Sequence, residues 1–84
     1  MTYSVLILLR AQRELASLPA EAYEKAKHAI DNLGENPRPP GSRRLTGRPG
    51  WRIRVGPYRV IYEINDGDST VTVLHVGHRR DVYR

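Results

Sequence analysis

The stretch that decides the fold is WRIRVGPYRVIYEI, residues 51–64. Apolar residues alternate with arginines before Gly56, and a run rich in β-branched and aromatic residues follows Pro57. Two such runs joined by a two-residue, glycine-led connection predict a β-hairpin, with Gly56 at positive φ and Pro57 near its fixed φ. If these two residues form the whole turn, the apolar face carries three cross-strand pairs: Trp51 with Tyr62, Ile53 with Val60, and Val55 with Tyr58.

The opposite face of this hairpin carries three guanidinium groups. The same register sets Arg54 opposite Arg59 and Arg52 opposite Ile61. Like charges set directly opposite each other destabilise a sheet, and neither strand offers a carboxylate placed to relieve Arg54 and Arg59. A guanidinium group is a rigid fork of donors that fits phosphate oxygens. The hairpin alone therefore predicts an anion-binding face, with phosphate as the leading ligand.

Positive charge is concentrated in the C-terminal part of the chain. The net charge is +5, but residues 36–84 hold ten arginines against four acidic residues, whereas residues 1–35 hold four basic against five acidic residues. A one-sided field of this kind attracts polyanions, nucleic acid first among them. We expect Arg43, Arg44 and Arg48 to grip an RNA backbone, which positions the RNA without reading its sequence.

Length and composition narrow the class of protein. Eighty-four residues allow one small domain, residues 1–84. The chain has no cysteine, which excludes a disulfide or thiolate site and fits a reducing compartment. The longest apolar run, residues 5–9, is too short to span a bilayer, so we expect a soluble, cytoplasmic protein without a membrane partner. His75 and His78 lack a third ligand at a usable spacing, so we expect no metal and no cofactor.

The remaining elements predict an α+β fold. Residues 3–9 indicate a first strand, whose near-continuous hydrophobicity favours a central place in the sheet. Residues 11–18 and 19–33 carry apolar stripes at helical spacing and predict a two-helix hairpin. Residues 35–50 contain too many breakers for regular structure and predict a long loop. With a last strand at residues 70–76, the order predicts a three-strand antiparallel meander with the helices packed on one face of the sheet.

The turn before the last strand leaves the register of that strand open. With Asp66-Gly67 as a two-residue turn, Val71, Val73 and His75 join the apolar face, whereas Val76 joins the arginine face. A three-residue turn would reverse the assignment.

Taken in order along the chain, these motifs resemble the RelE/ParE superfamily of type II toxins. The resemblance covers essentially the whole length and rests on the order of elements and on five motifs: Leu18-Pro19, Leu45-Thr46-Gly47, residues 51–54, residues 58–64 and GHRRDVY at residues 77–83. The last motif is similar to the RelE branch. That branch implies a ribosome-dependent endoribonuclease that cuts mRNA in the A site, is held inactive by a cognate antitoxin, and binds DNA only indirectly through the antitoxin complex.

Two alternatives stay open. ParE-like members share much of the scaffold and poison DNA gyrase. A catalytically inactive RNA-binding homologue would have the same basic face without the chemistry.

The resemblance also implies the residues of the site. It places basic catalytic residues at Arg52 and Arg54, a phosphate-stabilising arginine at Arg59, another arginine at Arg79 and a tyrosine at Tyr83. The best-studied branch has lysines where this chain has Arg52 and Arg54. Arginine does not deprotonate in proteins, so neither residue is a general base. The gap between Arg79 and Tyr83 is also shorter than in some members.

The implied reaction is metal-independent attack of a ribose 2′-hydroxyl on the adjacent phosphate. It needs cations around the developing phosphorane and groups that accept and donate a proton. Tyr83 is the first choice as base or orienting group, and His78 is the second choice for proton transfer because imidazole titrates near neutrality. His78 and Arg80 complete the residues expected to contact RNA. We expect three aromatic residues to be core rather than stacking platforms: Trp51, Tyr58 and Tyr62.

Overall fold

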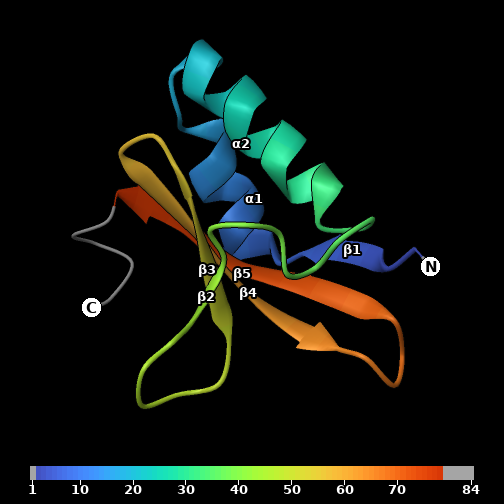
Figure 1. Cartoon of the computed structure of the whole chain (residues 1–84). Helices are drawn as coiled ribbons and strands as arrows, with labels where there is room; N and C mark the ends of the chain where they lie inside the picture. Colours follow the sequence, from blue (N-terminus) through green and yellow to red (C-terminus); the bar gives the residue numbers. More distant parts are fainter. Residues whose placement is uncertain (1, 79–84) are drawn as a thin grey trace.

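In the computed structural model, which describes residues 2–78, two helices cover one face of a five-stranded sheet (Figure 1). In chain order the elements are β1 (Ser4–Ile7), α1 (Leu9–Ala16), α2 (Ala20–Asn32), β2 (Arg43–Arg44), β3 (Trp51–Val55), β4 (Tyr58–Asn65) and β5 (Thr70–His78). The strands lie in the order β1-β5-β4-β3-β2, with β1 parallel to β5 and the other pairs antiparallel. The predicted α+β fold, with a two-helix hairpin packed on an antiparallel meander, is confirmed.

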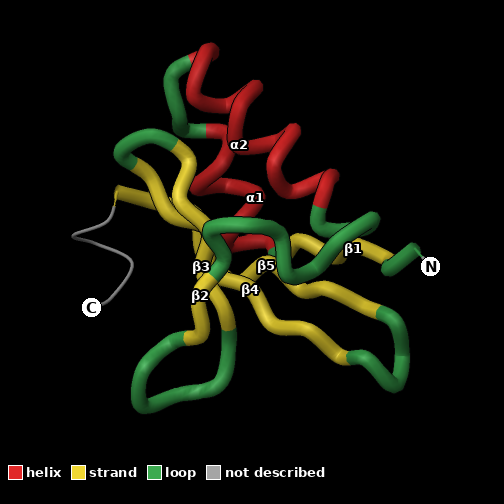
Figure 2. The backbone as a smooth tube through the Cα atoms, viewed as in Figure 1, coloured by secondary structure: helices red, strands yellow, loops and turns green. Residues whose placement is uncertain are grey.

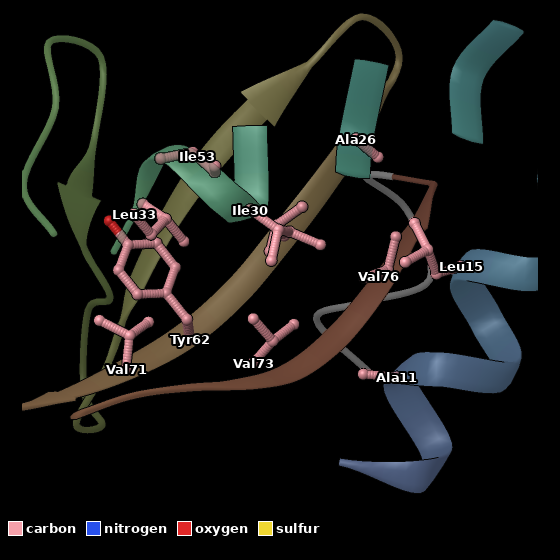
Figure 3. Packing of buried hydrophobic residues seen from close by; sticks show 11 residues of the cluster. Ala11, Leu15, Ala26, Ile30, Leu33, Ile53, Tyr62, Val71, Val73 and Val76 are labelled. Carbon is pink, nitrogen blue, oxygen red and sulfur yellow. The ribbon is translucent and has the colours of Figure 1, made fainter. Parts of the chain in front are cut away.

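The hydrophobic core lies between the helices and the central strands. Residues from both helices pack against β3, β4 and β5 in one cluster: Ala11, Leu15, Ala26, Ile30, Leu33, Ile53, Val60, Tyr62, Val71, Val73 and Val76. In Figure 3 the side chains of Ile30 on α2 and of Leu33 just after it point toward Tyr62 and Val73 of the sheet. Because each buried aliphatic side chain contributes about 1.5–3 kcal/mol, this face supplies most of the stability of so short a chain.

The helices begin and end slightly differently from the prediction. α1 starts at Leu9, two residues early, and includes Arg10, because the chain leaves the sheet after Ile7 and the Gln12 amide donates back to the Ile7 carbonyl at 2.8 Å. Pro19 precedes α2, with ψ of 151°, rather than opening it. The predicted apolar stripes do face the core, although Leu18 and Tyr23 are only partly buried against it.

The central position predicted for the first strand is wrong. β1 lies at the edge of the sheet and pairs only with β5, because the meander places β4 on the other side of β5 (Figure 2). Leu6, Leu8 and Leu9 are 54%, 47% and 60% exposed. The continuous hydrophobicity of this segment therefore marks an apolar surface at the β1 edge and the start of α1, not burial on both faces.

The turn between β4 and β5 and a β-bulge together set the register of β5. Asn65 pairs with Thr70, so residues 66–69 form the turn. A turn of four residues puts the same residues of β5 on the core face as a turn of two residues would. Val71 and Val73 consequently face the core, as in the two-residue alternative. The register then shifts between Ile61 and Tyr62. Beyond this bulge the two-residue alternative fails for two residues: Val76 is buried opposite Val60, and His75 lies opposite Ile61.

The long loop predicted without regular structure contains one short strand. Arg43 and Arg44 form β2, which pairs with Arg52 and Trp51 and extends the sheet at the far edge. The loop closes with a hydrogen bond from the Leu45 amide to a backbone carbonyl, and the glycines on this segment adopt positive φ. The basic loop is therefore attached to the sheet beside the arginines of β3.

Candidate nucleic-acid interface

The hairpin register places two arginine pairs directly across adjacent strands. Arg54 pairs with Arg59, as predicted, and Gly56 has φ of 59°. Arg43 of β2 pairs with Arg52, which the sequence did not indicate because no strand was expected there. Since cross-strand partners share a face and successive residues alternate, these four arginines project from the face that the helices leave uncovered. We call this set, Arg43, Arg52, Arg54 and Arg59, the arginine face.

Arg59 is the buried member of the arginine face. It lies on the interior strand β4 and is 8% exposed, whereas Arg54 across from it is exposed. On the other side Arg59 pairs with Gly77 of β5, which has no side chain to cover it. A charge at a buried position acts through a lower effective dielectric than a charge in open water. Its attraction for an approaching phosphate is correspondingly stronger.

Arg59 lines two pockets. The first, of about 240 Å³, surrounds the hairpin turn and is lined by Arg54, Gly56, Pro57, Tyr58, Arg59 and His78. The second, of about 330 Å³, lies under the basic loop and is lined by Arg44, Leu45, Thr46, Arg48, Arg52 and Arg59. Among the residues that the structure describes, neither lining includes an aspartate or glutamate. Two small cavities whose described linings carry arginines and no carboxylate are suited to phosphate groups.

The predicted RNA-binding arginines of the loop do not all face the same way. Arg43 joins the arginine face, and Arg48 lines the pocket under the loop. Arg44 pairs with Trp51, on the alternate face, and its Cζ atom lies 5.9 Å from the centre of the Trp51 ring. Arg44 therefore reaches the interface only at the edge of the sheet, where it also lines the loop pocket.

Arg38, which belongs to the basic loop by sequence, has a carboxylate partner. Its Nη2 atom lies 2.9 Å from Asp66 Oδ2, and Tyr3 donates to Asp66 Oδ1 at 2.6 Å. The hydrogen bond from Arg38 lowers the pKa of Asp66 and raises that of Arg38, and the bond to Asp66 raises the pKa of Tyr3. The Arg38 Cζ atom also lies 5.3 Å from the Trp51 ring centre. This network ties the start of the loop to the β4–β5 turn.

The three aromatic residues predicted as core have different environments. Tyr62 is fully buried, as predicted, and donates to the Pro37 carbonyl at 2.7 Å. Trp51 packs against the core but is partly exposed beneath its two arginines. Tyr58 is outside the core cluster, so that prediction is wrong: it lies at the end of the sheet, opposite His78. The reason is that Tyr58 borders an open pocket between the hairpin tip and the start of α2, where Pro19, Ala22 and Lys25 line the other side, instead of packing into the core.

Three predicted site residues lie outside the described residues: Arg79, Arg80 and Tyr83. Within the described chain no group of three histidine, cysteine, aspartate or glutamate side chains could hold a metal ion. None of its helices combines the length and apolar character needed to cross a bilayer.

Comparison with known families identifies the class of protein that this fold and face define. A family model described as the ParE toxin of type II toxin-antitoxin system, parDE, matches residues 5–83. The chain belongs to the RelE/ParE superfamily of type II toxins. It is therefore a toxin of a type II toxin-antitoxin system.

The individual relatives carry RelE-type names. Toxin RelG of Mycobacterium tuberculosis is 35% identical, over all of this chain and 99% of its own length. Toxin RelE of the same organism is 33% identical, over 98% of this chain and 87% of its own. The archaeal RelE-RelB complex from Pyrococcus horikoshii contains a chain with a TM-score of 0.84 and 32% identity, covering 96% of this chain and 99% of that one. The family model thus carries a ParE description, whereas these relatives carry RelE or RelG names.

Proposed function

We propose that this toxin is a ribosome-dependent endoribonuclease that cuts mRNA and so inhibits translation. The observation that carries the proposal is the arginine face, with buried Arg59 lining two pockets whose described walls carry positive charge and no carboxylate. Relatives named RelE and RelG support the RelE branch. We also propose that residues 1–84 act as one domain in the cytoplasm.

The reaction that suits this face is attack of a ribose 2′-hydroxyl on the adjacent phosphate. The 2′-oxygen forms a bond to phosphorus and the bond to the 5′-oxygen breaks, which leaves a cyclic phosphate and a free 5′-hydroxyl. Arg52, Arg54 and Arg59 stabilise the negative charge that develops on the phosphorane, and such electrostatic stabilisation usually contributes most to catalysis. The resemblance adds Arg79 to these cations and assigns Tyr83 as the group that accepts the 2′-hydroxyl proton. Because arginines supply the positive charge, the proposed reaction needs no metal ion.

The basic loop grips RNA on either side of the reacting phosphate. Arg43 and Arg48 contact backbone phosphates from the loop side, with Arg44 at the sheet edge and Arg80 after β5. Contacts of this kind position a strand without selecting its sequence. The ribosome completes the positioning of the mRNA by holding it in the A site.

A cognate antitoxin protein is the proposed partner that holds the toxin inactive. The relatives from Pyrococcus horikoshii and Escherichia coli are known in complexes with RelB antitoxins. In this chain Leu6 on the edge strand β1, with Leu8 and Leu9 at the start of α1, is exposed, and an antitoxin segment would bury these leucines. Any DNA binding by the toxin is indirect, through the antitoxin.

The test is expression of the toxin in growing cells, followed by mapping of mRNA 5′ ends. The wild type arrests translation and leaves cuts within translated codons. Arg54→Ala and Arg59→Ala each lower cleavage by about 10²–10³-fold, the cost of removing one charge-stabilising group. Arg54 is exposed, so the first variant separates a loss of chemistry from a loss of folding. Arg13→Ala, on the exposed surface of α1, is the matched control and cleaves normally. Intact transcripts in cells that contain folded wild-type toxin would exclude the proposal.

Gyrase poisoning is the second candidate, because the matching family model is described as a ParE toxin. A gyrase poison produces DNA breaks and an SOS response while transcripts stay whole. An inactive RNA-binding homologue produces neither effect and binds RNA with the same salt dependence before and after Tyr83→Phe.

A further inference from the structure

The arginine face lacks a group that can give up a proton readily. The leaving 5′-oxygen must gain a proton as its bond to phosphorus breaks, and guanidinium groups stay protonated in proteins. Apart from arginines, the titratable side chains lining the two pockets, within the part of the chain described, are Tyr58 and His78. Both line the pocket at the hairpin turn together with Arg54 and Arg59.

We propose that His78 is the general acid of this site and that Tyr58 positions its imidazole ring. This inference rests on the proposed endoribonuclease activity and deepens it. In the step, the protonated imidazole transfers one proton to the 5′-oxygen while the P–O5′ bond breaks. The new bond from the 2′-oxygen to phosphorus forms in the same displacement, and the 2′-hydroxyl proton goes to the separate base. Imidazole is suited to this step because histidine is the side chain that proteins use most often for general acid–base catalysis.

The end of the sheet brings these residues together. By alternation Tyr58 and His78 project from the face opposite to Arg59. However, the hairpin turns at Gly56 and Pro57 and β5 ends at His78, so both faces open into one pocket there. His78 is exposed, so its imidazole is accessible to a substrate in that pocket.

Tyr58 contacts His78 through its ring. The two residues are directly paired across β4 and β5, their ring centres are 6.1 Å apart, and the ring planes meet at 81°. An edge-to-face contact of this kind is favourable for aromatic rings and restricts rotation of an otherwise exposed side chain. The contact needs the Tyr58 ring and not its hydroxyl. Phenylalanine should therefore replace Tyr58 without loss.

The experiment uses programmed ribosomes and single-turnover cleavage of two mRNAs. One has the ordinary linkage at a site that the wild type cuts, and the other has sulfur in place of the bridging 5′-oxygen there. Because a thiolate leaves without protonation, loss of a general acid slows cleavage of the ordinary linkage and not cleavage of the sulfur linkage. His78→Ala should lower cleavage of the ordinary linkage about 10²–10⁴-fold, the usual contribution of a general acid, and leave cleavage of the sulfur linkage within about tenfold of the wild type. His28→Ala, on the exposed side of α2, is the matched control and should cleave both normally.

Tyr58 is tested in the same assay. Tyr58→Phe should keep the wild-type rate, whereas Tyr58→Ala should lower the rate at saturating toxin on the ordinary linkage and not on the sulfur linkage. An equal deficit of His78→Ala on both linkages, or normal cleavage of both, overturns the inference while leaving the endoribonuclease proposal intact. If the wild type itself cuts neither mRNA, the proposed function fails.

Discussion

Replacing Tyr62 with phenylalanine should change how stability depends on pH. Tyr62 is fully buried, and its hydroxyl donates to the Pro37 carbonyl at 2.7 Å, which links β4 to the start of the basic loop. Tyr62→Phe removes this hydroxyl donor and leaves the Pro37 carbonyl without its hydrogen bond from Tyr62. Loss of one such bond costs about 1 kcal/mol, which corresponds to a melting temperature lower by about 4–8 °C in a domain of this size.

The sign of this difference should reverse at high pH. Burial raises the pKa of Tyr62 to about 12, above the value of about 10 expected in the unfolded chain. A raised folded-state pKa stabilises the protein fully below the unfolded pKa, and this stability is lost as pH rises through the folded pKa. Two pKa units correspond to about 2.7 kcal/mol, so the wild type loses that amount between about pH 10 and pH 12 while the phenylalanine variant does not.

The measurement is denaturant unfolding of both proteins from pH 7 to pH 12, followed by circular dichroism. The other titrating groups are common to both chains, so their effects cancel in the difference. The wild type should be the more stable protein at neutral pH, the two curves should cross at about pH 10.5–11, and the variant should be the more stable above that. A difference that stays constant across this range would refute the burial argument for Tyr62.

Three other contacts lead to predictions that binding and unfolding measurements can check. Asp66→Asn releases the charge of Arg38, so the dependence of RNA binding on salt should become steeper by about 0.7 in the logarithmic slope, as measured by fluorescence anisotropy; an unchanged slope would mean that Arg38 cannot reach RNA. Arg43→Ala should reduce the same slope by about 0.7, whereas Arg13→Ala, with an identical change in net charge, should leave it unaltered. Val76→Ala should lower the free energy of unfolding by about 2 kcal/mol, because the bulge places this side chain in the core; a cost near zero would contradict that register.

The hairpin shows how far local sequence can specify structure. Its register depends on a turn of two adjacent residues and on alternation along two short strands, so Gly56 and Pro57 decide which residues face each other. The pairing of Arg54 with Arg59 is therefore predictable from the sequence of residues 51–64 alone. The family resemblance is likewise readable from motifs in order, whereas the catalytic roles of the arginines and Tyr83 stay predictions.

The position of the first strand shows where local reasoning stops. Hydrophobicity of residues 3–9 indicates that the segment avoids water but not which surface covers it. The sheet order leaves β1 at an edge because β5, from the other end of the chain, lies between it and β4. The leucines there are exposed and do not belong to the interior, and we propose that an antitoxin covers them.

By itself the sequence determined the α+β class, the hairpin with its opposed arginines and the concentration of positive charge, because each depends on residues close together in the chain or on composition. Only the tertiary structure decided that Arg59 is buried, that Asp66 neutralises Arg38, and that Tyr58 meets His78. The two pairwise contacts join residues 20 or more positions apart. Their geometry depends on the strand order and on the bulge in β5, and neither leaves a local signal in the sequence.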